Sequence, residues 1–218
     1  MLEKNITMIG AGKMATILST YFAKAGHKVF IGARESDKAS QLAINIGNGI
    51  QGGSIEDAVQ HGNIIYIAVP YLEIQEILKL TGSLKGKIVV DISNPLKADF
   101  SGILIGGETS AAEELAKSLP EATVVKAFNT LFATVLERGP EFGANRAQIF
   151  YAGDDESAKQ EIAELIETTG FDAMNVGPLS SARYLEQLTL LVIKADNHLK
   201  SSVQITPVLL ARPSISQS

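Results

Sequence analysis

Gly10, Gly12 and Ala15, near the start of the chain, have the spacing G-x-G-x-x-A. In a strand-to-helix turn the first residue permits a tight bend, the second lets a phosphate approach the backbone, and the third lets the helix pack closely. Free N–H groups and the positive helix end then attract a pyrophosphate. The motif follows the apolar run Ile6–Ile9 and opens an amphipathic segment, the context that makes it specific. The predicted dinucleotide-binding turn comprises Gly10, Ala11, Gly12, Lys13 and Met14.

The second predicted strand ends at Arg34, where an acidic residue is usual in NAD-binding sites. That acidic residue lies about 20 residues beyond the glycines and binds the ribose 2′-hydroxyl. The Arg34 guanidinium, the Ser36 hydroxyl and the Lys38 ammonium can each donate to phosphate oxygens, so they favour the 2′-phosphate of NADP. Glu35 and Asp37 lie close enough in sequence to bind a 2′-hydroxyl, which keeps NAD as the alternative.

Strand-like and helix-like segments alternate along the chain, a pattern typical of a parallel sheet with helices on both faces. We therefore expect an α/β fold: a Rossmann-type, doubly wound, mostly parallel sheet with a small C-terminal α/β extension. Predicted strands cover residues 6–9, 27–33, 49–53, 63–69, 87–92, 123–128, 148–152 and 171–176, and helices cover 14–22, 38–46, 72–80, 110–119, 156–168 and 179–199, with a further helix starting at Ser54.

We expect two parts in this chain of 218 residues. Residues 1–138 form the predicted NADP-binding domain, and residues 139–218 form a smaller subdomain that contributes to the acceptor pocket and to dimer contacts. Residues 140–145 have the composition of a loop. The tail from 201 to 218 contains prolines and several serines, so we expect it to be partly mobile.

Composition excludes several classes of function. The net charge of −5 and the isoelectric point near 5.3 do not indicate the basic surface that nucleic-acid binding requires. No apolar run approaches the ~18 residues of a membrane span, and the N-terminus has no signal-peptide core. The absence of cysteine excludes disulfides and thiolate chemistry. By elimination, we expect a cytoplasmic protein.

Candidate chemical residues follow the predicted strands, at the edge where open α/β sheets bind ligands. They are Ala68, Val69, Pro70, Asn94, Asn129 and Thr130. Small apolar groups can lie along a nicotinamide or ribose, and the Asn and Thr side chains could orient a carboxamide. Asn and Pro are also common turn residues, so a structural role is the alternative for each.

No residue pattern supplies an obvious general acid. His27, His61 and His198 lie away from these strand ends, and we expect each at the surface. Asp91 could act as an acid or base, or as a hydrogen-bonding strut. The sequence has no metal-binding or nucleophile motif. Direct hydride transfer between two bound cofactors fits best, because it requires proximity rather than a catalytic side chain.

Further segments resemble the F420-dependent NADP reductases and the related NADPH-binding domains of metalloreductases. The matching segments are residues 9–14, 32–34 with Lys38, 108–113, 125–130, 152–155 and 176–179 with 181–183, in the order of the family. The resemblance implies NADP(H) binding at Gly10–Met14, Arg34, Lys38, Val69, Pro70 and Asn94. It also implies coenzyme F420 or a flavin as second substrate, and often a homodimer built with the C-terminal part.

Three departures from the family pattern limit the resemblance, one beside Arg34 and two in segments that concern the second substrate. Glu35 stands where a further basic residue is common, and Asn129–Ala133 replaces a segment with His-Thr and Pro-Ala. Residues 201–218 replace a glycine-rich end that helps to form the deazaflavin pocket.

Three functions therefore stay open. The first is an NADPH-dependent reductase of a deazaflavin, flavin or similar planar acceptor. The second is a small-substrate reductase of the pyrroline-carboxylate reductase type, against which the short C-terminal part argues. The third is a non-enzymatic protein that senses NADPH or binds a partner. An acceptor screen at the NADPH absorbance band separates the first from the third.

Overall fold

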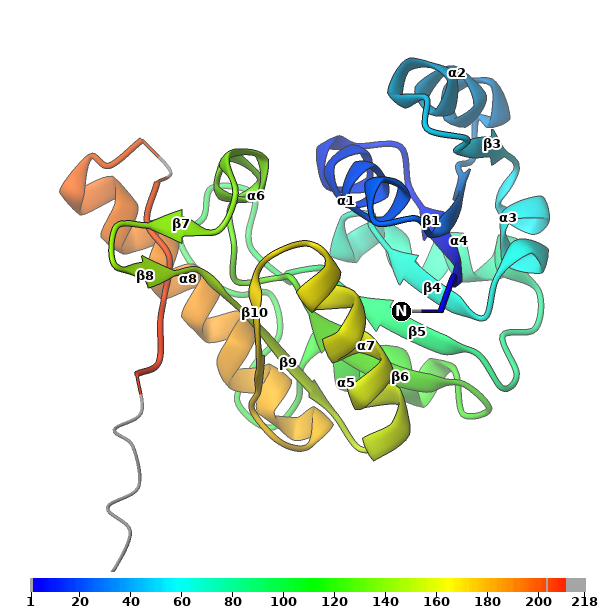
Figure 1. Ribbon diagram of the computed structural model, residues 1–218. Helices are drawn as coiled ribbons and strands as arrows, with labels where there is room; N and C mark the ends of the chain where they lie inside the picture. Colours follow the sequence, from blue (N-terminus) through cyan, green and yellow to red (C-terminus); the bar gives the residue numbers. More distant parts are fainter. Residues whose placement is uncertain (1, 203, 211–218) are drawn as a thin grey trace, which may run out of the picture.

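The computed structural model describes residues 2–202 and 204–210. The strands are β1 (Asn5–Ile9), β2 (Lys28–Gly32), β3 (Gln51–Gly53), β4 (Ile64–Ile67), β5 (Ile88–Asp91), β6 (Thr123–Ala127), β7 (Glu141–Phe142), β8 (Asn145–Arg146), β9 (Gln148–Gly153) and β10 (Asp172–Asn175). An eight-stranded sheet has the order β10-β9-β6-β5-β4-β1-β2-β3 and runs through the middle of the molecule (Figure 1). Its neighbouring strands are parallel except β6 and β9. The predicted Rossmann-type, mostly parallel sheet is confirmed.

Helices cover both faces of the sheet (Figure 1). One face carries α1 (Lys13–Lys24), α2 (Ser36–Ile46), α6 (Ala133–Arg138) and α7 (Glu156–Thr168), and the other carries α3 (Ile55–His61), α4 (Ile74–Thr81), α5 (Ala111–Ser118) and α8 (Ala182–Leu199). Short 3-10 helices η1 (Tyr71–Glu73) and η2 (Leu179–Ser181) precede α4 and α8. In β4, Ile64 and Tyr66 face the first layer, whereas Ile65 and Ile67 face the second. This burial on both faces explains the uniformly apolar strand sequence.

The chain beyond residue 138 extends this sheet. β9 pairs with β6 and β10 pairs with β9, and α8 packs on β9 and α5. The helical stretch predicted at 179–199 is thus confirmed as η2 and α8. Among the described residues, no helix has both the length and the apolar character that crossing a membrane requires.

The prediction of a simple loop at residues 140–145 is wrong, because β7 and β8 form a small hairpin there. Glu141 pairs with Arg146 and Phe142 with Asn145, and the intervening Gly143 has a φ of +64° that suits a tight turn. Arg146 Nη1 also lies 3.1 Å from Glu141 Oε1. Strands of two residues are too short to produce an alternating sequence pattern.

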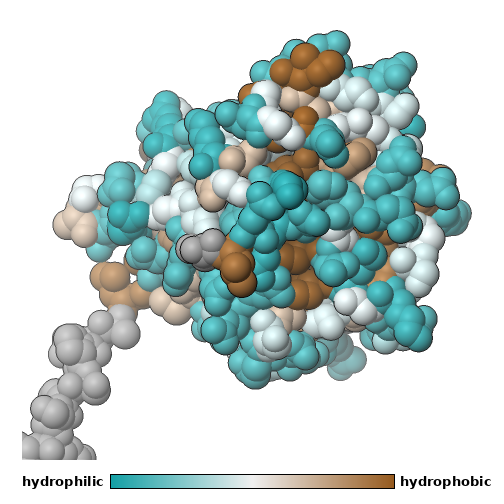
Figure 2. All heavy atoms as spheres, turned by 45° about the vertical axis from the view of Figure 1, so that its right-hand side comes forward, coloured by the Kyte–Doolittle hydropathy of each residue, from teal (hydrophilic) through white to brown (hydrophobic). Residues whose placement is uncertain are grey.

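The C-terminal segment is held beside β9 as far as residue 210. The Leu209 N–H donates to Gln148 Oε1 at 2.8 Å, and Gln148 Nε2 donates to the Leu209 carbonyl at 3.1 Å. Leu209 and Leu210 are exposed, and Figure 2 shows apolar surface where this segment ends. The predicted mobility of the tail falls partly on residues 203 and 211–218, which lie outside the described residues.

A fully buried lysine connects the sheet to α8. Lys126 Nζ, from β6, donates to Asp91 Oδ2 at 2.8 Å, to the Ser93 carbonyl at 2.7 Å and to Glu186 Oε1 at 2.8 Å. Glu186 also accepts hydrogen bonds from the N–H groups of Ala111 and Ala112 at the start of α5. Asp91 is therefore a strut, the second of its two predicted roles.

The charges in this cluster depend on one another. Burial alone would lower the Lys126 pKa, but Asp91 and Glu186 together raise it above its ordinary value. Burial raises the pKa of the Glu186 carboxyl, and Lys126 opposes that rise. Removal of the lysine would leave two carboxylates in the interior without their counter-ion.

We therefore expect Lys126→Met to lower the free energy of unfolding by about 3–5 kcal/mol, because breaking a buried ion pair strands its partners. Lys85→Met is the matched control, since Lys85 lies 2.7 Å from Glu121 in a largely exposed pair. Such a pair contributes about 0–1 kcal/mol. Urea unfolding of both variants measures the difference. Equal losses in the two variants would contradict this role for Lys126.

Candidate functional site

The turn between β1 and α1 leaves room for a phosphate group. Gly10 has a φ of +122°, and a Cβ placed there would lie 2.4 Å from the carbonyl oxygen of Ala68. A Cβ at Gly12 would meet no protein atom within 4 Å. Gly12 caps α1 without a side-chain hydrogen bond, and the first turn of α1 holds no acidic residue. Helix N–H groups and the positive helix end therefore face open space, as pyrophosphate binding requires.

A cavity of about 210 Å³ lies against this turn and the ends of β2 and β4. Eight of the predicted residues line it: Gly10, Ala11, Gly12, Arg34, Lys38, Ala68, Val69 and Pro70. Three predicted residues lie elsewhere. Lys13 pairs with Glu137 at 2.9 Å, Met14 packs against the core, and Ser36 is exposed at the start of α2.

The two cations of this cavity carry carboxylate partners. Arg34 Nη2 contacts Glu73 Oε2, and Lys38 Nζ lies 2.6 Å from Glu35 Oε1. Sequence reasoning missed Glu73, which lies on η1, 39 residues beyond Arg34. A signal existed only in the topology: β4 and β2 both neighbour β1, so the segments that follow them lie close together.

A second cavity, of about 410 Å³, lies where β5 and β6 end against α8. Its lining is mainly apolar and comprises Asn94, Leu96, Phe100, Asn129, Thr130, Leu131, Phe132, Thr189, Val192, Ile193, Asp196 and Asn197. The three predicted residues Asn94, Asn129 and Thr130 are brought together here. The sequence predicted that the C-terminal part contributes to a pocket but did not identify which residues of α8 line it, because the apolar stripe of this helix is typical of any core-facing helix.

Hydrogen bonds fix the polar end of this second cavity. Asn94 Nδ2 donates to the Asn129 carbonyl at 2.9 Å, and Asn129 Nδ2 donates to Asn94 Oδ1 at 3.0 Å. Thr189 Oγ1 donates to the same carbonyl at 3.0 Å. Among the described residues, the buried Asn129 Oδ1 and Thr130 Oγ1 have no hydrogen-bond partner. Both residues line the cavity, so these two atoms are candidates for a hydrogen bond to a ligand.

A strained residue sets the direction of this polar segment. Phe128 has a φ of +62°, a left-handed conformation that costs a non-glycine residue about 1–3 kcal/mol. Its buried ring packs against Tyr66 and Phe22, with ring centroids 5.9 Å and 6.4 Å apart. The ring packing offsets the cost of this backbone conformation. The left-handed conformation itself turns the chain after β6, so that Asn129 and Thr130 reach the cavity.

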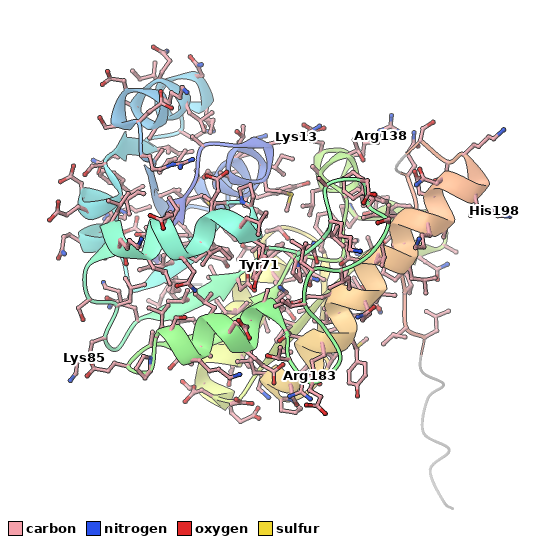
Figure 3. All side chains as sticks on the ribbon, turned by 180° about the vertical axis from the view of Figure 1, so that it is seen from behind. Lys13, Tyr71, Lys85, Arg138, Arg183 and His198 are labelled. Carbon is pink, nitrogen blue, oxygen red and sulfur yellow. The ribbon has the colours of Figure 1, made fainter. Side chains whose placement is uncertain are left out.

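None of the three histidines lines either cavity. The prediction that His27 lies at the surface is wrong: it is buried, and its Nδ1 accepts a hydrogen bond from the Lys4 N–H at 3.2 Å. Burial and the nearby Lys4 lower the His27 pKa. His61 is half-buried at the end of α3, and His198 is exposed at the far end of α8 (Figure 3).

Comparisons with known proteins show which family the chain belongs to. Residues 5–95 match the profile of the family described as NADP oxidoreductase, coenzyme F420-dependent. The F420-dependent NADP reductase of Methanocaldococcus jannaschii is 31% identical over 207 residues, which cover 88% of this chain and 92% of that protein. The chain belongs to the F420-dependent family of NADP oxidoreductases. The resemblance inferred from the motifs is confirmed.

Other similar proteins are longer than this chain or share a lower sequence identity with it. The metalloreductase STEAP3 of Rattus norvegicus is 34% identical over 85% of this chain, which spans only 36% of that protein. The structure of a candidate F420-dependent NADP-reductase from Arthrobacter sp. FB24 has a TM-score of 0.84 and 27% identity, over 96% of this chain and all of that one. A reductive aminase from Aspergillus terreus in complex with NADPH and ethyl levulinate has a TM-score of 0.68 at 18% identity, over 92% of this chain and 64% of that one, and so shares the fold.

The geometry of the turn predicts different results at its two glycines. We expect Gly12→Val to keep the melting temperature of the unmodified protein and to weaken NADPH binding at least about tenfold, or ~1.4 kcal/mol, because the new side chain occupies phosphate space. Gly10→Ala should lower both stability and binding, since its Cβ would meet the Ala68 carbonyl. Thermal unfolding and NADPH titration measure both variants. Undiminished NADPH affinity in Gly12→Val would contradict the site.

Proposed function

We propose that this protein transfers hydride directly between NADPH and a planar acceptor, such as a deazaflavin or a flavin. One observation carries the proposal: two cavities lie along the carboxyl ends of adjacent strands. The first follows β2, β1 and β4 and has the features of a dinucleotide site. The second follows β5 and β6, is mainly apolar and is lined by Asn129 and Thr130, each of which has a buried side-chain oxygen without a hydrogen-bond partner among the described residues. Membership in the family supports the same function.

The residues of the first cavity fit NADP(H). The N–H groups at Gly12 and the start of α1 would hold the pyrophosphate, and Arg34 and Lys38 would bind the 2′-phosphate. Ala68, Val69 and Pro70 would lie along the nicotinamide ribose. When bound, the nicotinamide supplies a hydride from C4 and is oxidised to NADP⁺ while the acceptor is reduced.

The residues of the second cavity would position the acceptor. Asn129 Oδ1 and Thr130 Oγ1 offer hydrogen bonds at one end, and the side chains of Phe132, Val192 and Ile193 provide apolar contact. Neither group of residues includes a histidine, and we assign no general acid. In this proposal the protein accelerates the reaction by proximity. It would hold the nicotinamide C4 and the reacting carbon of the acceptor about 3–3.5 Å apart and exclude water from the space between them.

A small-substrate reductase of the pyrroline-carboxylate reductase type is the second candidate. The observation that favours it is the volume of about 410 Å³, which lies toward the small end of the range for ligand pockets, about 300–1,000 Å³. Screening deazaflavin, flavin and cyclic imine acceptors at the NADPH absorbance band distinguishes the two candidates. Tight NADPH binding with no oxidation by any acceptor would favour a non-enzymatic NADPH sensor.

Labelled cofactor tests the proposed mechanism. With NADPH deuterated at C4, we expect the label on the acceptor ring carbon, because no exchangeable side chain intervenes. Recovery of the deuterium in water, with an acceptor position that does not exchange, would rule out direct transfer. Each His→Ala variant should keep kcat within a fewfold, since losing a true general acid costs about 10²–10⁴-fold.

A cavity-filling variant in the same assay locates the acceptor. Ile193→Trp should abolish label transfer or raise the acceptor KM at least about tenfold, ~1.4 kcal/mol, while the NADPH Kd stays unchanged. Lys194→Trp is the control, because Lys194 is the next residue on α8, is exposed and does not line the cavity. Equal effects of the two variants would place the acceptor elsewhere.

We also propose that the protein is a cytoplasmic homodimer in which α8 takes part. Tyr184, Leu191 and Leu199 on this helix are 75%, 62% and 64% exposed, and monomers rarely display large apolar patches. Light scattering should give about twice the chain mass of 23.2 kDa. A mass of one chain at high concentration would contradict the dimer.

A further inference from the structure

The guanidinium assigned to the 2′-phosphate is already engaged by a carboxylate. Arg34, at the end of β2, pairs with Glu73 of η1, and both residues line the first cavity. The side chains are 57% and 38% exposed, so the pair is open to exchange. A phosphate that binds Arg34 must compete with this carboxylate.

The charges lining this cavity balance. Arg34 and Lys38 are its cations, and Glu35 and Glu73 are its anions. A 2′-phosphate adds nearly two negative charges next to these carboxylates, whereas the 2′-hydroxyl of NADH adds none. Carboxylates here therefore repel the phosphate of NADPH, whereas the uncharged 2′-hydroxyl of NADH meets no such repulsion and can donate a hydrogen bond to a carboxylate or to an amide oxygen in its place.

The two carboxylates are not equivalent. Glu35 pairs with Lys38, three residues later in the first turn of α2. The Glu35 side chain is 67% exposed, so it can turn into solvent. Glu73 is anchored: its N–H donates to the Pro70 carbonyl at 2.9 Å, and the following Ile74 and Ile77 are buried against the sheet. This turn fixes the backbone of Glu73 at a position from which its carboxylate contacts Arg34.

We propose that Glu73 is a specificity-determining residue, whose carboxylate competes with the cofactor 2′-phosphate for Arg34 and limits the affinity for NADP(H). This inference rests on the proposed position of the cofactor. It predicts that the chain binds NADPH more weakly than its two cations alone would allow.

The test compares Glu73→Gln with the unmodified protein by titrating the fluorescence of NADPH and NADH. The chain contains no tryptophan, so its own emission interferes little. We expect the NADPH Kd to fall about three- to tenfold, ~0.7–1.4 kcal/mol, with the NADH Kd changed less than about twofold. The gain should shrink as salt is added, because the pair is exposed. Glu76→Gln is the matched control, since Glu76 pairs with Lys79 and does not line the cavity.

An unchanged or weaker NADPH affinity in Glu73→Gln would overturn the inference, as would an equal gain for NADH or in the Glu76 control. Arg34→Asp separates this failure from a failure of the proposed cofactor position. It should weaken NADPH binding by about 10- to 150-fold, as loss of a charge-assisted hydrogen bond does. If Arg34→Asp leaves NADPH binding intact, the 2′-phosphate does not lie at Arg34 and the cofactor position itself is wrong.

Discussion

The ammonium group of Lys126 holds together the elements that form the second cavity. It lies between Asp91 at the end of β5 and Glu186 on α8, and it also donates to the Ser93 carbonyl next to Asn94. Glu186 in turn accepts from the first N–H groups of α5. Loss of any one partner would leave an uncompensated charge in the interior, so the position of α8 and that of the Asn94 turn depend on one another.

Segments that carried the family resemblance in the sequence prove to brace α8 against the sheet. Arg183 donates to both carboxylate oxygens of Glu113, at 2.8 Å and 2.6 Å. Asp154 accepts from the Leu179 N–H at 2.8 Å, where η2 begins. These contacts join motifs that lie far apart along the chain. The resemblance thus includes contacts that build the wall of the cavity as well as Asn129 and Thr130, which line it.

Sequence reasoning succeeded where function follows from local backbone geometry. The turn at Gly10 and Gly12 is defined by adjacent residues, and the polar residue Asn94 was found because parallel strands end at one edge. It failed where the relevant partner is distant: Glu73 meets Arg34, and Thr189 meets Asn129, only through the fold. The same limit explains why the burial of His27 was not predicted. Its hydrogen-bond partner is the backbone N–H of Lys4, which precedes the neighbouring strand β1 and is distant in sequence.

The central claim is that one cofactor joins the two cavities, with its 2′-phosphate end at Arg34 and its nicotinamide directed toward Asn94 and Asn129. A crystal structure of the NADP⁺ complex tests this most directly. The account predicts density for the pyrophosphate at the N–H groups of the Gly12 turn and a nicotinamide ring beyond Val69 and Pro70, with C4 facing the second cavity. A nicotinamide directed away from that cavity, or a pyrophosphate bound elsewhere, would contradict it.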